Sequence, residues 1–204
     1  MTAVAATLIS VVFLATGAPA ADAHVLEGAR LFRENRFPEA LVEFRLADKL
    51  GSPDARGYAA AALVKLNRPE DALELFERPA APASGADPLL DYYHARACYD
   101  LRLYLCADHL LAGVGSRTGP RIGDQAAQIR KDIATALPGE PAANVVGWYL
   151  KRSRDHAAGG RPVLARAFAR EARDLGGRRA DRQGVAEAEA LLANLDGSKP
   201  SPAP

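Results

Sequence analysis

The sequence predicts an all-helical protein built from antiparallel helix hairpins. Alanine and leucine are abundant while valine, isoleucine and threonine are scarce, a composition that favours helix over strand. In addition, the stretch NRFPEALVEF at residues 35–44 returns in altered form as NRPEDALELF at residues 67–76, 32 residues later. A repeat with a period of 20–50 residues is typical of stacked helical modules.

Length, composition and charge narrow the class of protein further. The chain has 204 residues, of which 49% are hydrophobic and 25% charged. This is enough apolar material for one domain or one short repeat array. The formal net charge is only +1, so no overall electrostatic field favours nucleic acid as a partner.

Both ends of the chain differ from its middle. The apolar run AVAATLISVVFLATG is followed by small residues, so we expect residues 1–23 to be a cleaved signal peptide and the protein to be periplasmic or secreted. The mature chain would then have no transmembrane span. Because no Lys or Arg precedes the apolar run, an uncleaved anchor remains an alternative. The tail, residues 197–204, lacks large apolar side chains and is predicted to be disordered.

Helix start and stop signals divide the remainder into two-helix units. Asn35 and Asn67 are placed to end helices, whereas Pro38 and Pro69 are suited to first turns. The glycine pairs 159–160 and 176–177 are interpreted as helix stops. Helices are expected at residues 24–34, 37–50, 53–66, 69–78, 88–100, 104–114, 124–137, 142–158, 162–176 and 184–195, with a loop over 115–123.

The first three units resemble the tetratricopeptide repeat (TPR) family, whose unit is a helix–turn–helix with small residues where its helices meet. Similarity is good over residues 24–78 and fair to residue 115. A degenerate fourth unit is suggested by Trp148, Gly160, Ala165 and Ala172. The residues that match the pattern are Gly28, Ala40, Phe44 and Ala47 in the first unit, Ala60, Ala72 and Phe76 in the second, and Ala95, Ala107 and Leu111 in the third.

The resemblance implies a right-handed superhelical array, a TPR-like solenoid of about three to four repeats with a C-terminal capping helix. Residues 24–115 would form the TPR-like repeats, and residues 116–196 a helical continuation with the degenerate repeat and the cap. Small residues let two backbones approach closely, and each unit buries its apolar face against the next. An irregular helical bundle is the alternative.

Two cysteines, Cys98 and Cys106, allow two interpretations. Eight residues apart on one helix they would lie about 12 Å apart, too far to bond. A turn near 101–103 would bring them together, so that a disulfide pins the third hairpin. Alternatively, they are two buried free thiols.

No sequence motif indicates catalysis. The chain contains no glycine-rich phosphate loop, no G-x-S-x-G and no H-E-x-x-H motif, and its four histidines show no metal-ligand spacing. We therefore predict that the protein is not an enzyme and has no catalytic, cofactor-binding or metal site. Residues 151–183 hold ten Lys or Arg against four Asp or Glu, which makes an anionic partner for this segment a further hypothesis.

The resemblance also indicates where a partner would bind. TPR proteins hold peptides or protein segments on the concave face that their first helices line. This implies a non-catalytic adaptor or scaffold of the bacterial cell envelope. The alternatives are a periplasmic chaperone or assembly factor, or a recruiting subunit of a peptidoglycan enzyme. The expected partner-binding residues are Phe32, Arg33, Val64, Lys65, Tyr92, Arg96, Tyr99 and Asp100.

Overall fold

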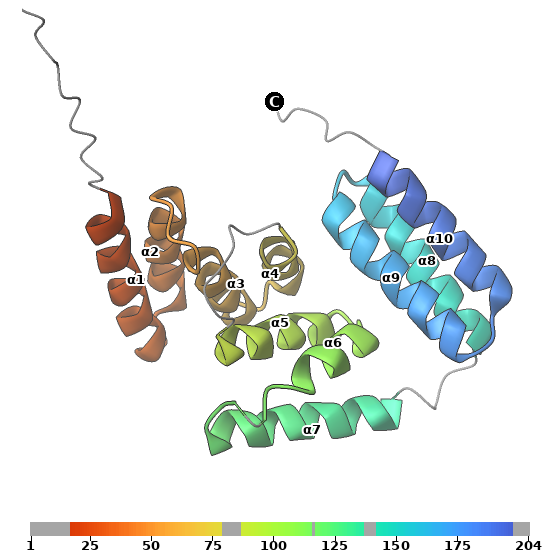
Figure 1. Ribbon diagram of the computed structural model, residues 1–204, viewed down its shortest axis with the longest axis horizontal. Coiled ribbons are helices and arrows are strands. Elements are labelled where there is room, and N and C mark those ends of the chain that lie inside the picture. The colour runs from red at the N-terminus through yellow and green to blue at the C-terminus, as the bar shows by residue number, and fades with distance from the viewer. Residues whose placement is uncertain (1–16, 79–86, 116, 137–141, 198–204) are drawn as a thin grey trace, which may run out of the picture.

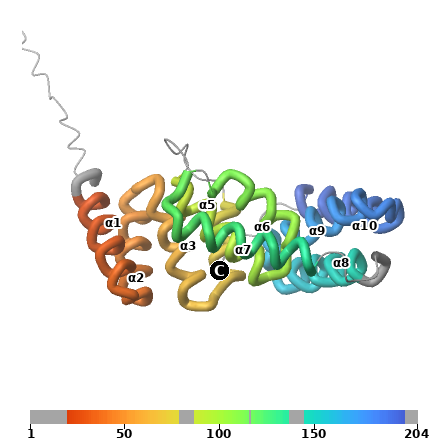
Figure 2. The backbone as a smooth tube through the Cα atoms, turned by 90° about the horizontal axis from the view of Figure 1, so that it is seen from below, coloured from red at the N-terminus to blue at the C-terminus, as the bar shows by residue number. Residues whose placement is uncertain are grey.

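The computed structural model describes residues 17–78, 87–115, 117–136 and 142–197, and every regular element in these ranges is a helix. The helices follow one another from one end of an elongated molecule to the other (Figures 1 and 2). The all-α prediction is confirmed. The ten helices in the described ranges are α1 (Gly17–Arg33), α2 (Phe37–Lys49), α3 (Ala55–Lys65), α4 (Pro69–Phe76), α5 (Pro88–Asp100), α6 (Tyr104–Leu111), α7 (Pro120–Ala136), α8 (Ala142–Ala158), α9 (Pro162–Arg178) and α10 (Arg182–Gly197).

Residues 1–16 and 198–204 lie outside the described ranges, and with them most of the expected signal peptide and tail. Helix α1 begins at Gly17, so the end of the expected signal peptide is helical. Within the described residues, no helix combines the length and the apolar character needed to cross a membrane.

One turn type joins the helices of every hairpin. A residue with positive φ ends the first helix, and the amide N–H of the next residue donates to the carbonyl five positions back. This is the Schellman motif, which satisfies carbonyls left unpaired at a helix C-terminus. The positive-φ residues are Asn35 (61°), Asn67 (57°), Arg102 (64°), Gly160 (71°) and Ala180 (57°).

The small residues at the helix crossings are buried, as predicted. Ala40, Ala60 and Ala72 are fully buried, and α2 packs directly on α3, so the first two hairpins lie side by side. A Cβ atom on Gly28 would lie 2.6 Å from Cε1 of Phe44, so only glycine admits this ring. Ala95 and Ala107 in the third hairpin are equally buried.

Several expected helix bounds were wrong, and those of α7 and α9 bear on the packing. Helix α7 begins at Pro120, so the expected loop over 115–123 is shorter. Helix α9 continues through Gly176 and Gly177 to Arg178 instead of stopping there. The physical reason is packing, because a Cβ atom on Gly176 would lie 3.0 Å from Cγ2 of Val185 on α10. Gly176 thus allows a close helix contact and does not end the helix. Gly160, by contrast, is the predicted stop.

The C-terminal helices α8, α9 and α10 form a bundle (Figure 1). Of these three helices, α9 packs on α4 and α6. Ion pairs join this bundle to α4 and to the residue that follows it. Arg161, at the start of α9, pairs with Glu70, Asp71 and Glu74 of α4, and Arg170 pairs with Glu77 just beyond it. The C-terminal bundle is therefore held against the second helices of the second and third hairpins.

Candidate functional site

The first helices of three hairpins surround an apolar cavity of about 200 Å³. Its walls come from α1, α2, α3 and α5. Phe32 of α1 meets Tyr93 of α5 edge to face, with ring centroids 5.6 Å apart. The lining residues are Ala29, Phe32, Arg33, Phe44, Tyr58, Ala61, Leu89, Leu90 and Tyr93.

Local sequence fixes the position of the α5 wall. Asp87 caps α5 by accepting the amide N–H of Leu89 at 2.9 Å, and it also accepts the hydroxyl of Tyr58 at 3.1 Å. On α3, Gly57 leaves room for Leu90, whose Cδ1 would lie 2.7 Å from a Cβ atom there. Burial, followed by the nearby Asp87 carboxylate, raises the pKa of Tyr58 to about 12, so this phenol stays neutral.

Two cationic side chains, Lys65 and Arg33, lie at the edge of the cavity. The Nζ of Lys65 lies 5.8 Å from the ring centroid of Tyr93 and 5.7 Å from that of Phe37. Arg33 donates through Nε to the carbonyl of Ala29 at 3.2 Å. Among the described residues neither cation is in an ion pair.

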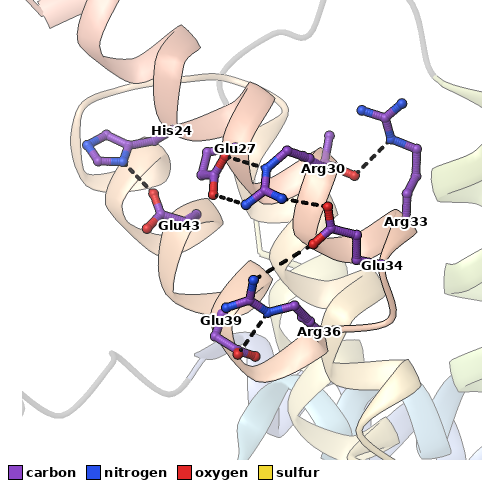
Figure 3. Close-up of polar contacts among 9 residues, drawn as sticks. His24, Glu27, Arg30, Arg33, Glu34, Arg36, Glu39 and Glu43 are labelled. Atoms are coloured by element: carbon purple, nitrogen blue, oxygen red, sulfur yellow. Dashed lines mark hydrogen bonds and ion pairs between the residues drawn. The ribbon is translucent and has the colours of Figure 1, made fainter.

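Figure 3 shows how Arg33 differs from its neighbours. Arg30 pairs with Glu27 and Glu34, and Arg36 pairs with Glu34 and Glu39, so these side chains form one network across α1 and α2. Arg33 lies apart from that network and contacts only its own helix in the figure. Its positive charge is therefore not matched by the carboxylates beside it.

The structure divides the eight predicted partner-binding residues into two groups. Phe32, Arg33, Val64 and Lys65 lie at or beside the cavity and the rings that form it. Tyr92 is only 5% exposed, and its hydroxyl donates to Gln125 of α7 at 2.9 Å. Arg96 pairs with Asp100, and Tyr99 lies against Tyr104 with ring centroids 6.0 Å apart.

Helix α7 therefore covers part of the group formed by Tyr92, Arg96, Tyr99 and Asp100. Sequence reasoning missed the residues that complete the cavity, Tyr58, Leu89, Leu90 and Tyr93. Leu89, Leu90 and Tyr93 share one face of α5 at i, i+1 and i+4, a spacing that could have identified them.

A second site lies in the third hairpin. The Schellman turn at Arg102 brings the Sγ atoms of Cys98 and Cys106 to 2.6 Å, as a turn near 101–103 would require. No S–S bond joins them in this structure, and the disulfide stays a prediction. One ligand atom of His94 lies with both sulfurs inside a group no wider than 4.8 Å. The ring of His94 stacks on Phe76 with centroids 4.7 Å apart.

Glu171 of α9 holds the start of α6 at this site. Its carboxylate accepts the amide N–H of Leu105 at 2.6 Å and that of Cys106 at 3.1 Å. It thereby supplies the cap that α6 lacks in its own sequence. Burial raises the pKa of Glu171 to about 7, although the two N–H donors oppose the rise.

The basic segment 151–183 finds acidic partners within the chain. Arg166 pairs with Asp196, Arg170 with Glu77 and Arg173 with Asp174. An anionic partner for this segment stays a prediction, and such a partner would have to compete with these carboxylates. Comparisons of the chain with protein-family models, with curated proteins and with solved structures find no match.

Proposed function

We propose that this chain is a non-catalytic adaptor that binds a segment of a partner protein in the cavity between α1, α3 and α5. The observation that carries the proposal is an almost wholly apolar cavity with two cations outside any described ion pair at its edge. A large apolar side chain fits the cavity, and a neighbouring acidic residue fits Arg33 and Lys65. Binding of this kind uses a central apolar anchor within a polar rim.

The succession of similar helix hairpins supports the same function. Its hairpins repeat one turn and one set of buried small residues, and Phe32, Val64 and Tyr93 come from its first helices. In the TPR-like arrangement these helices line the concave face. The expected signal peptide would place the adaptor in the cell envelope, and an aromatic or leucine side chain of an envelope protein is the expected anchor.

A peptide-display selection on the full chain tests the proposal. We expect the selected peptides to share a large apolar residue next to Asp or Glu. Fluorescence anisotropy then measures the affinity of the best peptide for variants. Arg33→Glu combined with Lys65→Glu should weaken binding at least about tenfold, because two attractive charges become repulsive. Ala29→Phe, which fills the cavity, should weaken it without a change of charge.

The matched control reverses two charges on the exposed side of α2, Arg45→Glu and Lys49→Glu, and should leave the affinity unchanged. Equal weakening by the control pair would mean that overall charge causes the effect. Tight binding by Ala29→Phe would contradict the cavity as the binding site. Selected peptides that share no sequence pattern would favour the chaperone function instead.

A further inference from the structure

Three side chains with metal-binding atoms converge in the third hairpin. His94 and Cys98 lie one turn apart on the same face of α5, and Cys106 lies in the first turn of α6. One ligand atom from each falls within a group no wider than 4.8 Å. Cys98 is completely buried, and Cys106 and His94 are half-buried. Two thiols and an imidazole are a ligand set that soft and borderline cations prefer.

The imidazole of His94 is held in place yet lacks a hydrogen-bond partner at Nε2. This atom is buried, and no described group bonds to it. Its nearest acidic neighbour, Oε1 of Glu77, lies 3.8 Å away, beyond hydrogen-bond distance. Phe76 stacks on one ring face and fixes the orientation of the imidazole. A buried polar atom without a partner calls for an explanation, and a bound ion is one of those that recur in proteins.

Two carboxyl groups lie beside the three side chains. Glu77, which also pairs with Arg170, lies next to His94, and the Glu171 carboxyl group accepts the backbone N–H of Cys106. On one side Cys106 and Glu171 open onto a hollow of about 710 Å³.

We propose that His94, Cys98 and Cys106, in the reduced protein, bind one Zn²⁺ ion with a fourth position open toward this hollow. Each thiol loses its proton to solvent as its Zn–S bond forms, and no electron is transferred. Three protein ligands with one open position are an arrangement that zinc adopts readily. Glu171 positions Cys106 through its amide N–H without being a ligand itself.

The proposal requires one local movement. Two thiolates on a tetrahedral zinc ion lie about 3.7 Å apart, given Zn–S bonds of about 2.3 Å. The two sulfurs are 2.6 Å apart in this structure, so the side chain of Cys106 must turn outward by about an ångström. Oxidation of the pair to a disulfide would close the site, and zinc binding therefore requires reduced thiols.

Zinc titration of the full chain tests the site. Protein kept reduced and stripped of metal is titrated with Zn²⁺ against a chromophoric zinc indicator, and Co²⁺ serves as a spectroscopic probe. We expect one ion per chain and the charge-transfer absorption of thiolate bound to Co²⁺. Cys98→Ser and Cys106→Ser should each lower zinc affinity at least about 100-fold, and His94→Gln at least about tenfold, since each removes a ligand.

His24→Gln, on α1 away from the cluster, is the matched control and should bind zinc like the wild type. Circular dichroism checks that each variant is folded, and a zinc-dependent rise in Tm of the wild type gives a second readout. Zinc affinity in the wild type no greater than in the serine variants would overturn the proposal. So would an unchanged affinity and Co²⁺ spectrum in His94→Gln, or undiminished zinc binding by the oxidised protein.

Discussion

Phe32 and Tyr93 meet edge to face, with ring centroids 5.6 Å apart, although they belong to the first and third hairpins. Ala61 and Val64 of the second hairpin belong to the same apolar cluster as these two rings. This contact forms one wall of the apolar cavity and links its shape to the packing of three helices.

We predict that Phe32 and Tyr93 are energetically coupled. In a double-mutant cycle of Phe32→Leu and Tyr93→Leu, measured by urea unfolding, the coupling free energy should be about 0.5–1.5 kcal/mol. The pair Phe32→Leu and Phe168→Leu serves as control, because Phe168 lies in the C-terminal bundle. The losses of unfolding free energy caused by these two changes should be additive. A coupling near zero for Phe32 and Tyr93 would contradict the contact.

Gly28 should tolerate no Cβ atom. Gly28→Ala would place Cβ 2.6 Å from a ring atom of the buried Phe44, so the ring would have to shift. We expect a loss of about 1–3 kcal/mol in unfolding free energy. Adding Phe44→Leu to Gly28→Ala should restore part of this loss. Gly147→Ala, a helical glycine with open space around it, should instead raise stability by up to about 1 kcal/mol.

Ala180 offers a stabilising substitution. It ends the α9 turn with φ of 57°, a left-handed conformation in which a Cβ atom is unfavourable. Ala180→Gly should raise the unfolding free energy by about 0.5–1 kcal/mol. The same change at Ala134, an exposed position within α7, should lower it by about 1 kcal/mol. If both changes lower stability equally, the turn at Ala180 is not left-handed in solution.

Arg161 should link the C-terminal bundle to α4 in a salt-dependent way. Its guanidinium contacts Glu70, Asp71 and Glu74, with Nε 2.6 Å from Glu74. Arg161→Met leaves three carboxylates together, and we expect a loss of about 1 kcal/mol after allowance for solvent screening. The loss should shrink in 1 M NaCl. Lys151→Met, which breaks an exposed pair within α8, should have a smaller effect at either salt concentration.

His156 should make stability fall in acid. Burial, followed by the charge of Arg152, lowers the pKa of His156, and its Nε2 is buried without a partner. Folded protein therefore binds fewer protons here than unfolded protein, so this stability is present above about pH 6.5 and is lost as pH falls through the lowered pKa. Arg161 also lowers this pKa, whereas Glu70 and Asp155 raise it.

Urea unfolding between pH 7.5 and 5.5 measures this loss. The difference between wild type and His156→Leu removes the contributions of other groups, including His94, whose pKa burial also lowers. We expect the wild type to lose more stability than the variant over this range. Parallel curves would show that His156 does not titrate differently in the folded state.

The sequence by itself determined the hairpins. Asn35 and Asn67 indicated turns, and the buried alanines indicated helix crossings, because both signals are local and act over one or two helical turns. Arg102 and Ala180 gave no such signal, since neither residue type favours positive φ, and there the surrounding packing imposes the turn. The sequence therefore left open whether Cys98 approaches Cys106, and the turn at Arg102 decides it.

Only the tertiary structure decided which residues far apart in the sequence contact one another. Arg161 meets α4, and Glu171 reaches the backbone beside Cys106, because α9 packs on α4 and α6. Long-range ion pairs and hydrogen bonds produce no periodic pattern in a sequence. From the sequence alone, many arginines of this chain could pair with any of its carboxylates. Which of them meet is set by how whole helices bury their apolar faces, and a local pattern does not encode that arrangement.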